Sequence, residues 1–143
     1  MLLISDIDGT VADDHDIDWR RPDLQVAEAR PYPDIVRLLK TSREAGAILC
    51  FVTGRPLQLK AQTIEWLDRH VGGPYGLCMR PDGVAPYDLP AYKVTAIDQV
   101  AQQVKPDRIL VFEDNVDVLR ACRALDAALF RCTDGSADRF EEP

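Results

Sequence analysis

Five short apolar segments of strand length alternate with segments of helical periodicity, and this alternation constrains the fold more than any other feature. The apolar segments lie at 2–4, 47–52, 75–79, 108–112 and 127–130. Helical patterns lie at 33–46, 57–70, 95–104 and 116–125. Alternating strands and helices favour a parallel sheet covered by helices on both faces. We therefore expect an α/β fold with a doubly wound, Rossmann-like parallel sheet of five strands.

The length of 143 residues, with 46% hydrophobic residues, predicts one domain with its own core. We place that domain at 1–132. Segment 11–32 has no sustained period and is expected to form an exposed flap, and the Pro/Asp/Gly segment 80–92 is expected to form a substrate loop. The polar residues 133–143 are expected to form a frayed tail.

No apolar run approaches the length of a membrane span, and the N-terminus lacks a basic region followed by a long apolar one. We expect a cytoplasmic protein without membrane contact. The four cysteines are scattered without a C-x-x-C pair, which favours reduced thiols packed in a core. They are Cys50, Cys78, Cys122 and Cys132. The sequence leaves the oligomeric state open.

The net charge is −7, from 17 Lys and Arg against 24 Asp and Glu. Non-specific binding to duplex DNA depends on neutralising many phosphates, so this charge disfavours a broad grip on a duplex. It does not exclude contact with a nucleic-acid end.

Unusual polar residues follow three of the expected strands. Asp6 and Asp8 follow the first strand, Thr53-Gly54-Arg55 follow the second, and Glu113-Asp114 follow the fourth. Ligands of parallel sheets gather outside the carboxyl ends of the strands, so we expect these residues to share one pocket.

The expected pocket suits phosphoryl transfer. Asp6, Asp8 and Asp114 would repel one another without a cation, and their hard oxygen donors favour Mg²⁺, which would also keep Asp6 ionised and nucleophilic. The Thr53 hydroxyl, the Gly54 N–H and the Lys93 ammonium are candidate phosphate ligands. No G-x-x-x-x-G-K-S/T loop is present, which argues against a P-loop enzyme.

Over 1–132 the chain resembles the haloacid dehalogenase-like (HAD) hydrolases. The resemblance rests on D-I-D-G-T at 6–10, V-T-G-R at 52–55, Lys93, and F-E-D-N-V-D at 112–117. It implies that Asp6 is a nucleophile that takes the phosphoryl group and that Asp8 is the general acid and base. It also implies that Mg²⁺ is held by the Asp6 side chain, the Asp8 backbone carbonyl and Asp114.

The acid/base aspartate at position 8 is the phosphatase pattern of this family, which disfavours dehalogenation. Segments 11–32 and 80–92 are each too short for a folded cap domain, so we expect a core without a cap and an open pocket.

A narrower resemblance suggests a substrate. C-M-R-P-D-G at 78–83, Lys93-Val94 and I-L-V-F-E-D-N at 109–115 are similar to the 3′-phosphatase domain of bacteriophage-type polynucleotide kinase/phosphatases. Those domains carry Asp-Asp-Arg where this chain has Glu113-Asp114-Asn115. The leading substrate is thus a polynucleotide 3′-phosphate end. The alternatives are a nucleotide or other small phosphomonoester, and an inactive domain that binds a phosphorylated ligand.

Several residues have two interpretations. Arg55 and Arg80 either bind the substrate or pair with nearby acids. Glu113 and Asp117 either support the metal site or are ordinary acids at a helix N-terminus.

The flap also carries polar and aromatic residues that require interpretation. We expect its acids to be solvated rather than to form a second metal site; they are Asp13, Asp14, Asp16 and Asp18. The lone histidines His15 and His70 are expected at the surface. Trp19 is expected to anchor the flap, the alternative being that it stacks on a base beside Arg20-Arg21.

Overall fold

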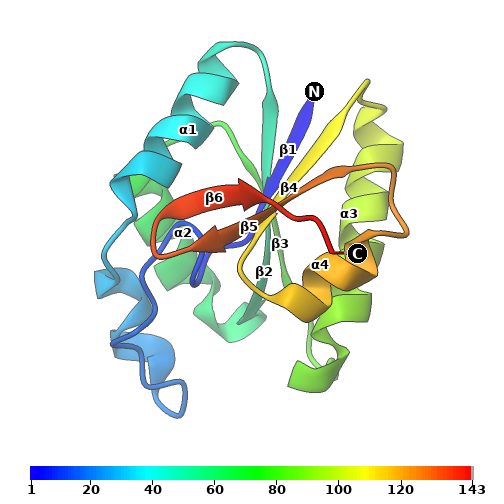
Figure 1. The fold of residues 1–143 in the computed structure, drawn as a ribbon. Helices are drawn as coiled ribbons and strands as arrows, with labels where there is room; N and C mark the ends of the chain where they lie inside the picture. Colours follow the sequence, from blue (N-terminus) through cyan, green and yellow to red (C-terminus); the bar gives the residue numbers. More distant parts are fainter. Residues whose placement is uncertain (143) are drawn as a thin grey trace.

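The computed structural model describes residues 1–142, which form one mixed sheet with helices on both faces (Figure 1). The strand order is β3-β2-β1-β4-β5-β6. The strands are β1 Leu2–Ser5, β2 Ile48–Pro56, β3 Gly76–Arg80, β4 Ile109–Glu113, β5 Ala128–Thr133 and β6 Ser136–Arg139. The helices are α1 Pro33–Glu44, α2 Lys60–His70, α3 Leu89–Val104 and α4 Val116–Cys122.

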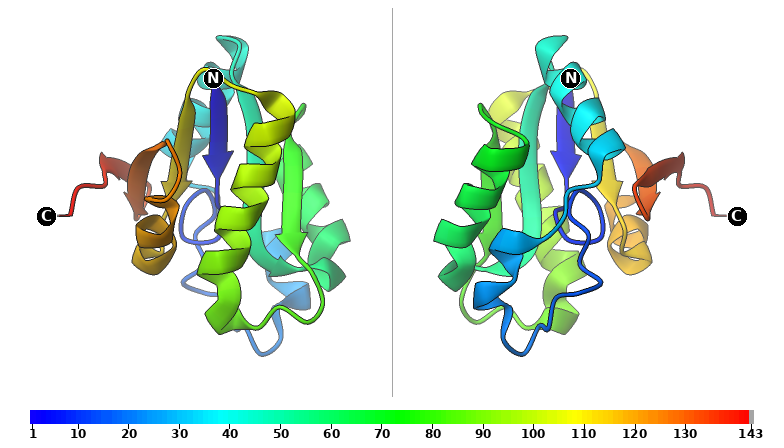
Figure 2. Two further views of the ribbon diagram at one scale, coloured as in Figure 1. Left: turned by 90° about the vertical axis from the view of Figure 1, so that its right-hand side faces the viewer. Right: turned by 90° about the vertical axis from the view of Figure 1, so that its left-hand side faces the viewer.

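Alternate strand residues face opposite helical layers. Leu3 belongs to the core that includes Ile35 and Leu39 of α1 and Trp66 of α2. Its neighbours Leu2 and Ile4 belong to the opposite core, which includes Ile97 of α3 and Leu119 of α4. The two views of Figure 2 show these layers on the two faces of the sheet. The period of two along a strand that is buried on both faces explains the continuous apolar run of β1.

The sheet has six strands, so the prediction of five parallel strands was one strand short. β6 lies within the segment predicted as a frayed tail and pairs antiparallel with β5 at the sheet edge. Asp134 and Gly135 both have positive φ, at 46° and 85°, as a two-residue hairpin turn requires. β6 is mostly exposed and lacks an apolar run, which is why periodicity missed it, although the Asp-Gly pair is a hairpin signal.

α3 begins at Leu89, whereas the prediction placed residues 80–92 in a loop and began the helix near Thr95. Pro90 lies in the first helical turn, where a missing N–H leaves no hydrogen bond unmade. The earlier start carries Lys93 on the helix itself, and Lys93 is buried.

The flap 11–32 contains two 3-10 helices, η1 Pro22–Leu24 and η2 Val26–Glu28, and no folded cap. Val26 is fully buried and packs in a small core with Leu59 and Met79. The Trp66 indole N–H donates to the Ala29 carbonyl at 2.7 Å. These contacts hold the flap against the α2 side of the molecule.

Candidate active site

β1 lies in the interior of the sheet, where the strand order switches: β2 and β3 lie on one side of it, and β4, β5 and β6 lie on the other. It pairs in parallel with β2 on one side and β4 on the other, with Ser5 opposite Phe51 and Phe112. The Asp6 N–H donates to the Phe112 carbonyl at 2.9 Å, which brings Asp6 beside the end of β4. This register brings Asp6 next to Glu113 and Asp114, as the sequence predicted for residues that follow these strands.

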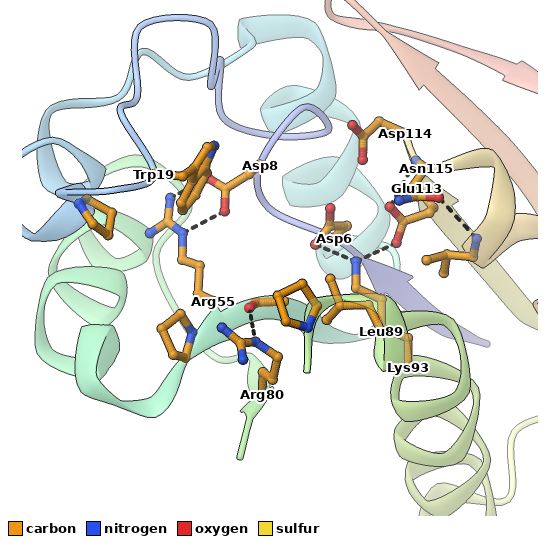
Figure 3. A pocket seen from close by; sticks show the side chains of 15 residues that line it. Asp6, Asp8, Trp19, Arg55, Arg80, Leu89, Lys93, Glu113, Asp114 and Asn115 are labelled. Carbon is orange, nitrogen blue, oxygen red and sulfur yellow. Dashed lines mark hydrogen bonds and ion pairs between the residues drawn. The ribbon is translucent and has the colours of Figure 1, made fainter. Parts of the chain in front are cut away.

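Lys93 lies between two buried carboxylates. Its ammonium is 2.9 Å from Asp6 Oδ1 and donates to Glu113 Oε2 at 2.7 Å (Figure 3). The three residues are between 2% and 6% exposed. Lys93, which was expected in a loop, therefore lies on α3, and its ammonium contacts the carboxylate of Asp6, the candidate nucleophile.

The carboxylates of this cluster titrate abnormally. Burial raises the pKa of Asp6 to about 7, with Glu113 adding to the shift and Lys93 opposing it. Burial likewise raises the pKa of Glu113 to about 7, and burial with the Asp6 charge raises that of Asp114 to about 6. Burial alone would lower the pKa of Lys93, but the Asp6 and Glu113 charges outweigh it and raise that pKa. With all three carboxylates ionised, the single Lys93 leaves the cluster with excess negative charge, and the raised pKa values reflect the cost of that charge.

The carboxylates fit a divalent cation. Oxygen atoms of Asp6, Glu113 and Asp114 all lie within 4.8 Å of one another. Gly9, at φ +78°, permits this arrangement, because a Cβ at that position would collide with the Asp114 carboxylate. Hard oxygen donors with uncompensated charge suit Mg²⁺. Glu113 already accepts hydrogen bonds from Lys93 and from the Asn115 N–H, so Asp6 and Asp114 have the more available oxygens.

Asp8 is held by Arg55. The guanidinium donates from Nε to Asp8 Oδ2 at 2.9 Å and from Nη2 to Oδ1 at 2.7 Å (Figure 3). Its third contact is the Thr63 hydroxyl at 3.2 Å, and Arg55 is only 1% exposed. Arg55 therefore pairs with a nearby acid, one of its two interpretations, and it also lines the cavity that a substrate would enter.

Arg80 is engaged by the backbone rather than by an acid. Its Nε donates to the Gly54 carbonyl at 2.9 Å and its Nη1 to the Val84 carbonyl at 2.7 Å. Thr53 is fully buried, and its hydroxyl accepts from the Arg55 N–H at 3.1 Å. Gly54 lies in the cavity wall, with Leu89 so close that an added Cβ would be 3.0 Å from its Cδ2.

A cavity of about 400 Å³ joins these groups. Its charged wall contains Asp6, Asp8, Arg55, Arg80, Lys93, Glu113 and Asp114. The remaining wall comes from Trp19 and Pro22 of the flap, Gly54, Pro56, Pro86, Leu89, Asn115 and Val118. The sequence did not predict the prolines, Leu89 or Val118, because they reach the cavity through packing of separate segments. Asn115 was missed too, although its position before α4 is a helix-cap signal, and its side chain accepts from two N–H groups of that helix.

Other predicted residues lie away from this cavity. Asp117 is exposed and pairs with Arg120 at 3.0 Å, so it is a surface acid of α4. The flap acids do not line the cavity within the described residues, and Asp13 pairs with His15. Trp19 is 46% exposed in the cavity wall, and the buried anchors of the flap are Val26 and the hydrogen bond from Trp66 to the Ala29 carbonyl.

The four cysteines are free, as predicted. No helix among residues 1–142 has the length and apolar character needed to cross a membrane.

Known proteins resemble this chain in structure but not detectably in sequence. No protein-family model matches the sequence, and no curated protein matches it. Solved structures do match. Two describe a Pnkp1/Rnl/Hen1 complex, one of them named as an RNA repair complex, with TM-scores of 0.74 and 0.72 and identities of 17% and 16%. Each covers 92% of this chain, which spans less than half (45% and 42%) of the matched chains.

A third structure is D,D-heptose 1.7-bisphosphate phosphatase from B. bronchiseptica complexed with magnesium and phosphate. It has a TM-score of 0.69 and 19% identity and covers 94% of this chain and 82% of its own. The doubly wound α/β class is thereby confirmed. More narrowly, the chain has the haloacid dehalogenase-like fold.

Proposed function

We propose that this protein is a Mg²⁺-dependent phosphomonoesterase that forms an aspartyl phosphate on Asp6, with a polynucleotide 3′-phosphate end as its leading substrate. The observation that carries the proposal is the placement of Asp6 against Lys93 at 2.9 Å, in a cavity that also contains Asp8 and Asp114. The likeness to a heptose bisphosphate phosphatase supports the reaction, and the likeness to a chain of an RNA repair complex supports the substrate class.

The residues divide the reaction between them. The Asp6 carboxylate attacks phosphorus, and Lys93 offsets charge on Asp6 and on the phosphoryl oxygens. Asp8 protonates the leaving oxygen and then removes a proton from the water that hydrolyses the aspartyl phosphate. Arg55 fixes the Asp8 carboxylate, and Thr53 and Gly54 belong to the strand end that would receive the phosphoryl group.

Asp6 and Asp114, with the Asp8 backbone carbonyl, would hold Mg²⁺, which would supply positive charge against the phosphoryl oxygens. We place this activity in the domain expected at 1–132, to whose sheet the structure adds the edge strand β6.

The decisive experiment measures phosphate release, with and without Mg²⁺, from an aryl phosphate, mononucleotides and an oligonucleotide with a 3′-phosphate. We expect Mg²⁺-dependent turnover and preference for the oligonucleotide. Asp6→Asn should abolish turnover, while the matched control Asp98→Asn, on exposed α3 surface, should not. Preference for mononucleotides would favour a nucleotidase instead. Phosphate binding without any turnover would indicate an inactive phospholigand-binding domain.

A further inference from the structure

Trp19 is the one large aromatic side chain in the cavity wall, counted over the described residues, and it belongs to neither large hydrophobic core. It is 46% exposed and contributes to the same cavity as Asp6 and Asp8 (Figure 3). The flap is anchored elsewhere, by Val26 and by the hydrogen bond between Trp66 and Ala29. A half-exposed indole in the wall of a polar cleft offers an aromatic face to a ligand.

The turn that carries Trp19 is well defined. The Arg21 N–H donates to the Asp18 carbonyl at 2.8 Å, and the Asp18 carboxylate accepts from the Arg20 N–H at 3.0 Å. The Asp18 N–H in turn donates to the Gln25 side chain. These bonds fix the backbone on both sides of Trp19, so its ring is presented to the cavity by an ordered turn.

Trp19 lies beside Asp8 and Arg55 in the cavity wall (Figure 3), and Pro22 of the same flap also lines the cavity. Pro56, Pro86 and Leu89 add further apolar residues to the wall. A flat group placed against the exposed indole would stack on it, and such stacking is favourable for any nucleobase because each has a π-face.

The cations of the cavity are already engaged, which argues against a second phosphate in this part of the site. Arg55 pairs with Asp8, Lys93 pairs with Asp6 and Glu113, and Arg80 donates to two backbone carbonyls. Among the described wall residues, no other cation remains. The cation beside Trp19 is Arg55, whose charge is neutralised by Asp8, so no unpaired positive charge next to Trp19 calls for an anionic substrate portion there.

We propose that Trp19 is a specificity-determining residue that stacks on the base of the terminal nucleotide while its phosphate lies at Asp6. This inference rests on the proposed phosphatase function and names how that site selects its substrate. The cavity volume of about 400 Å³ lies near the lower end of the range for small-molecule sites, which suits one nucleotide unit. Selection therefore comes from the flap, in a fold without a cap domain.

The test compares two single-stranded trinucleotides with a 3′-phosphate, one with a terminal adenine and one with a terminal abasic residue. The measured quantity is the ratio of their kcat/KM values. Trp19→Ala should lower this ratio about 5- to 140-fold, the range expected for loss of one base stack. Trp19→Phe should retain most of it. The matched control is Tyr87→Ala, which removes an aromatic ring that is 85% exposed and outside the cavity.

Fluorescence gives a readout that does not depend on turnover. In Asp6→Asn, the adenine-ended trinucleotide should quench tryptophan emission, and the abasic one should quench much less. The signal should disappear in Asp6→Asn/Trp19→Phe, because Trp66 is fully buried.

An unchanged kcat/KM ratio in Trp19→Ala, or equal quenching by both trinucleotides, would overturn the stacking role. Absence of turnover on every phosphomonoester would instead overturn the proposed function. Base-dependent quenching in that case would still support nucleotide stacking on Trp19.

Discussion

The Arg55 guanidinium donates two hydrogen bonds, of 2.9 Å and 2.7 Å, to the Asp8 carboxylate, and the Arg55 side chain is almost completely buried. This bidentate pair sets the plane of the carboxylate. A carboxylate has about four lone-pair sites, so the pair leaves others for a substrate oxygen or a water. In the proposed mechanism, this pair would orient Asp8 for proton transfer on the cavity side, where its side chain is 13% exposed.

Arg55→Lys tests this orientation. A lysine keeps the positive charge but cannot form the planar two-point contact. We expect kcat for an aryl phosphate to fall about 100-fold, because small misplacements of catalytic groups have effects of that order. The surface pair of Arg69 with Glu65 offers the matched control, Arg69→Lys. Equal kcat values for the two variants would show that the bidentate contact is unimportant.

Lys93→Met should destabilise the fold as well as stop turnover. The substitution leaves the Asp6 and Glu113 carboxylates buried without their counter-charge, and removing one partner of a buried ion pair costs about 3–5 kcal/mol. Urea denaturation gives the free energy of unfolding. Lys60→Met, at an exposed position on α2, is the control and should cost little.

The double variant Lys93→Met/Glu113→Gln separates charge from packing. Because it removes one of the two repelling carboxylates, it should recover part of the stability that Lys93→Met loses. No recovery would mean that the loss comes from lost side-chain packing and not from unbalanced charge.

Mg²⁺ should stabilise the protein against heat. A cation relieves repulsion among the carboxylates of Asp6, Glu113 and Asp114, and saturation at about 100 times the dissociation constant contributes about 2.7 kcal/mol. The expected rise in Tm is about 5–10 °C. Scanning calorimetry should show a much smaller rise for Asp114→Asn, and the full rise for Asp117→Asn, whose carboxylate is exposed and pairs with Arg120. An identical response in all three proteins would contradict the assigned metal site.

Gly9→Ala should disrupt the site through a direct collision. The added Cβ would meet the Asp114 carboxylate, and the backbone at φ +78° also disfavours alanine. Gly72→Ala is a close control, since φ is +69° and no heavy atom lies within 4 Å of the added Cβ. Both variants should lose about 1 kcal/mol of stability from backbone strain.

Only Gly9→Ala should also abolish the rise in Tm that Mg²⁺ causes. It alone should also lower the rate of phosphate release strongly. If both alanine variants responded to Mg²⁺ like the wild type, the contact between Gly9 and Asp114 would have no role in the site.

The fold was predictable because its signals are local. The apolar runs that become β1, β2, β3, β4 and β5 are each bounded by turn residues, so periodicity found them. β6 and the first turn of α3 were missed, since β6 gains its stability from pairing with β5, and α3 begins through a proline-bearing turn that resembles a loop in sequence.

The sequence by itself determined the sheet class and the set of polar residues that follow the strands, because strand periodicity and parallel connections require no knowledge of distant contacts. Only the tertiary structure decided how those residues pair. Arg55 pairs with Asp8, Lys93 pairs with both Asp6 and Glu113, and Trp19 lies half-exposed in the cavity wall. These outcomes depend on packing between segments far apart in the chain, where burial strengthens each ion pair and selects a partner for each charge.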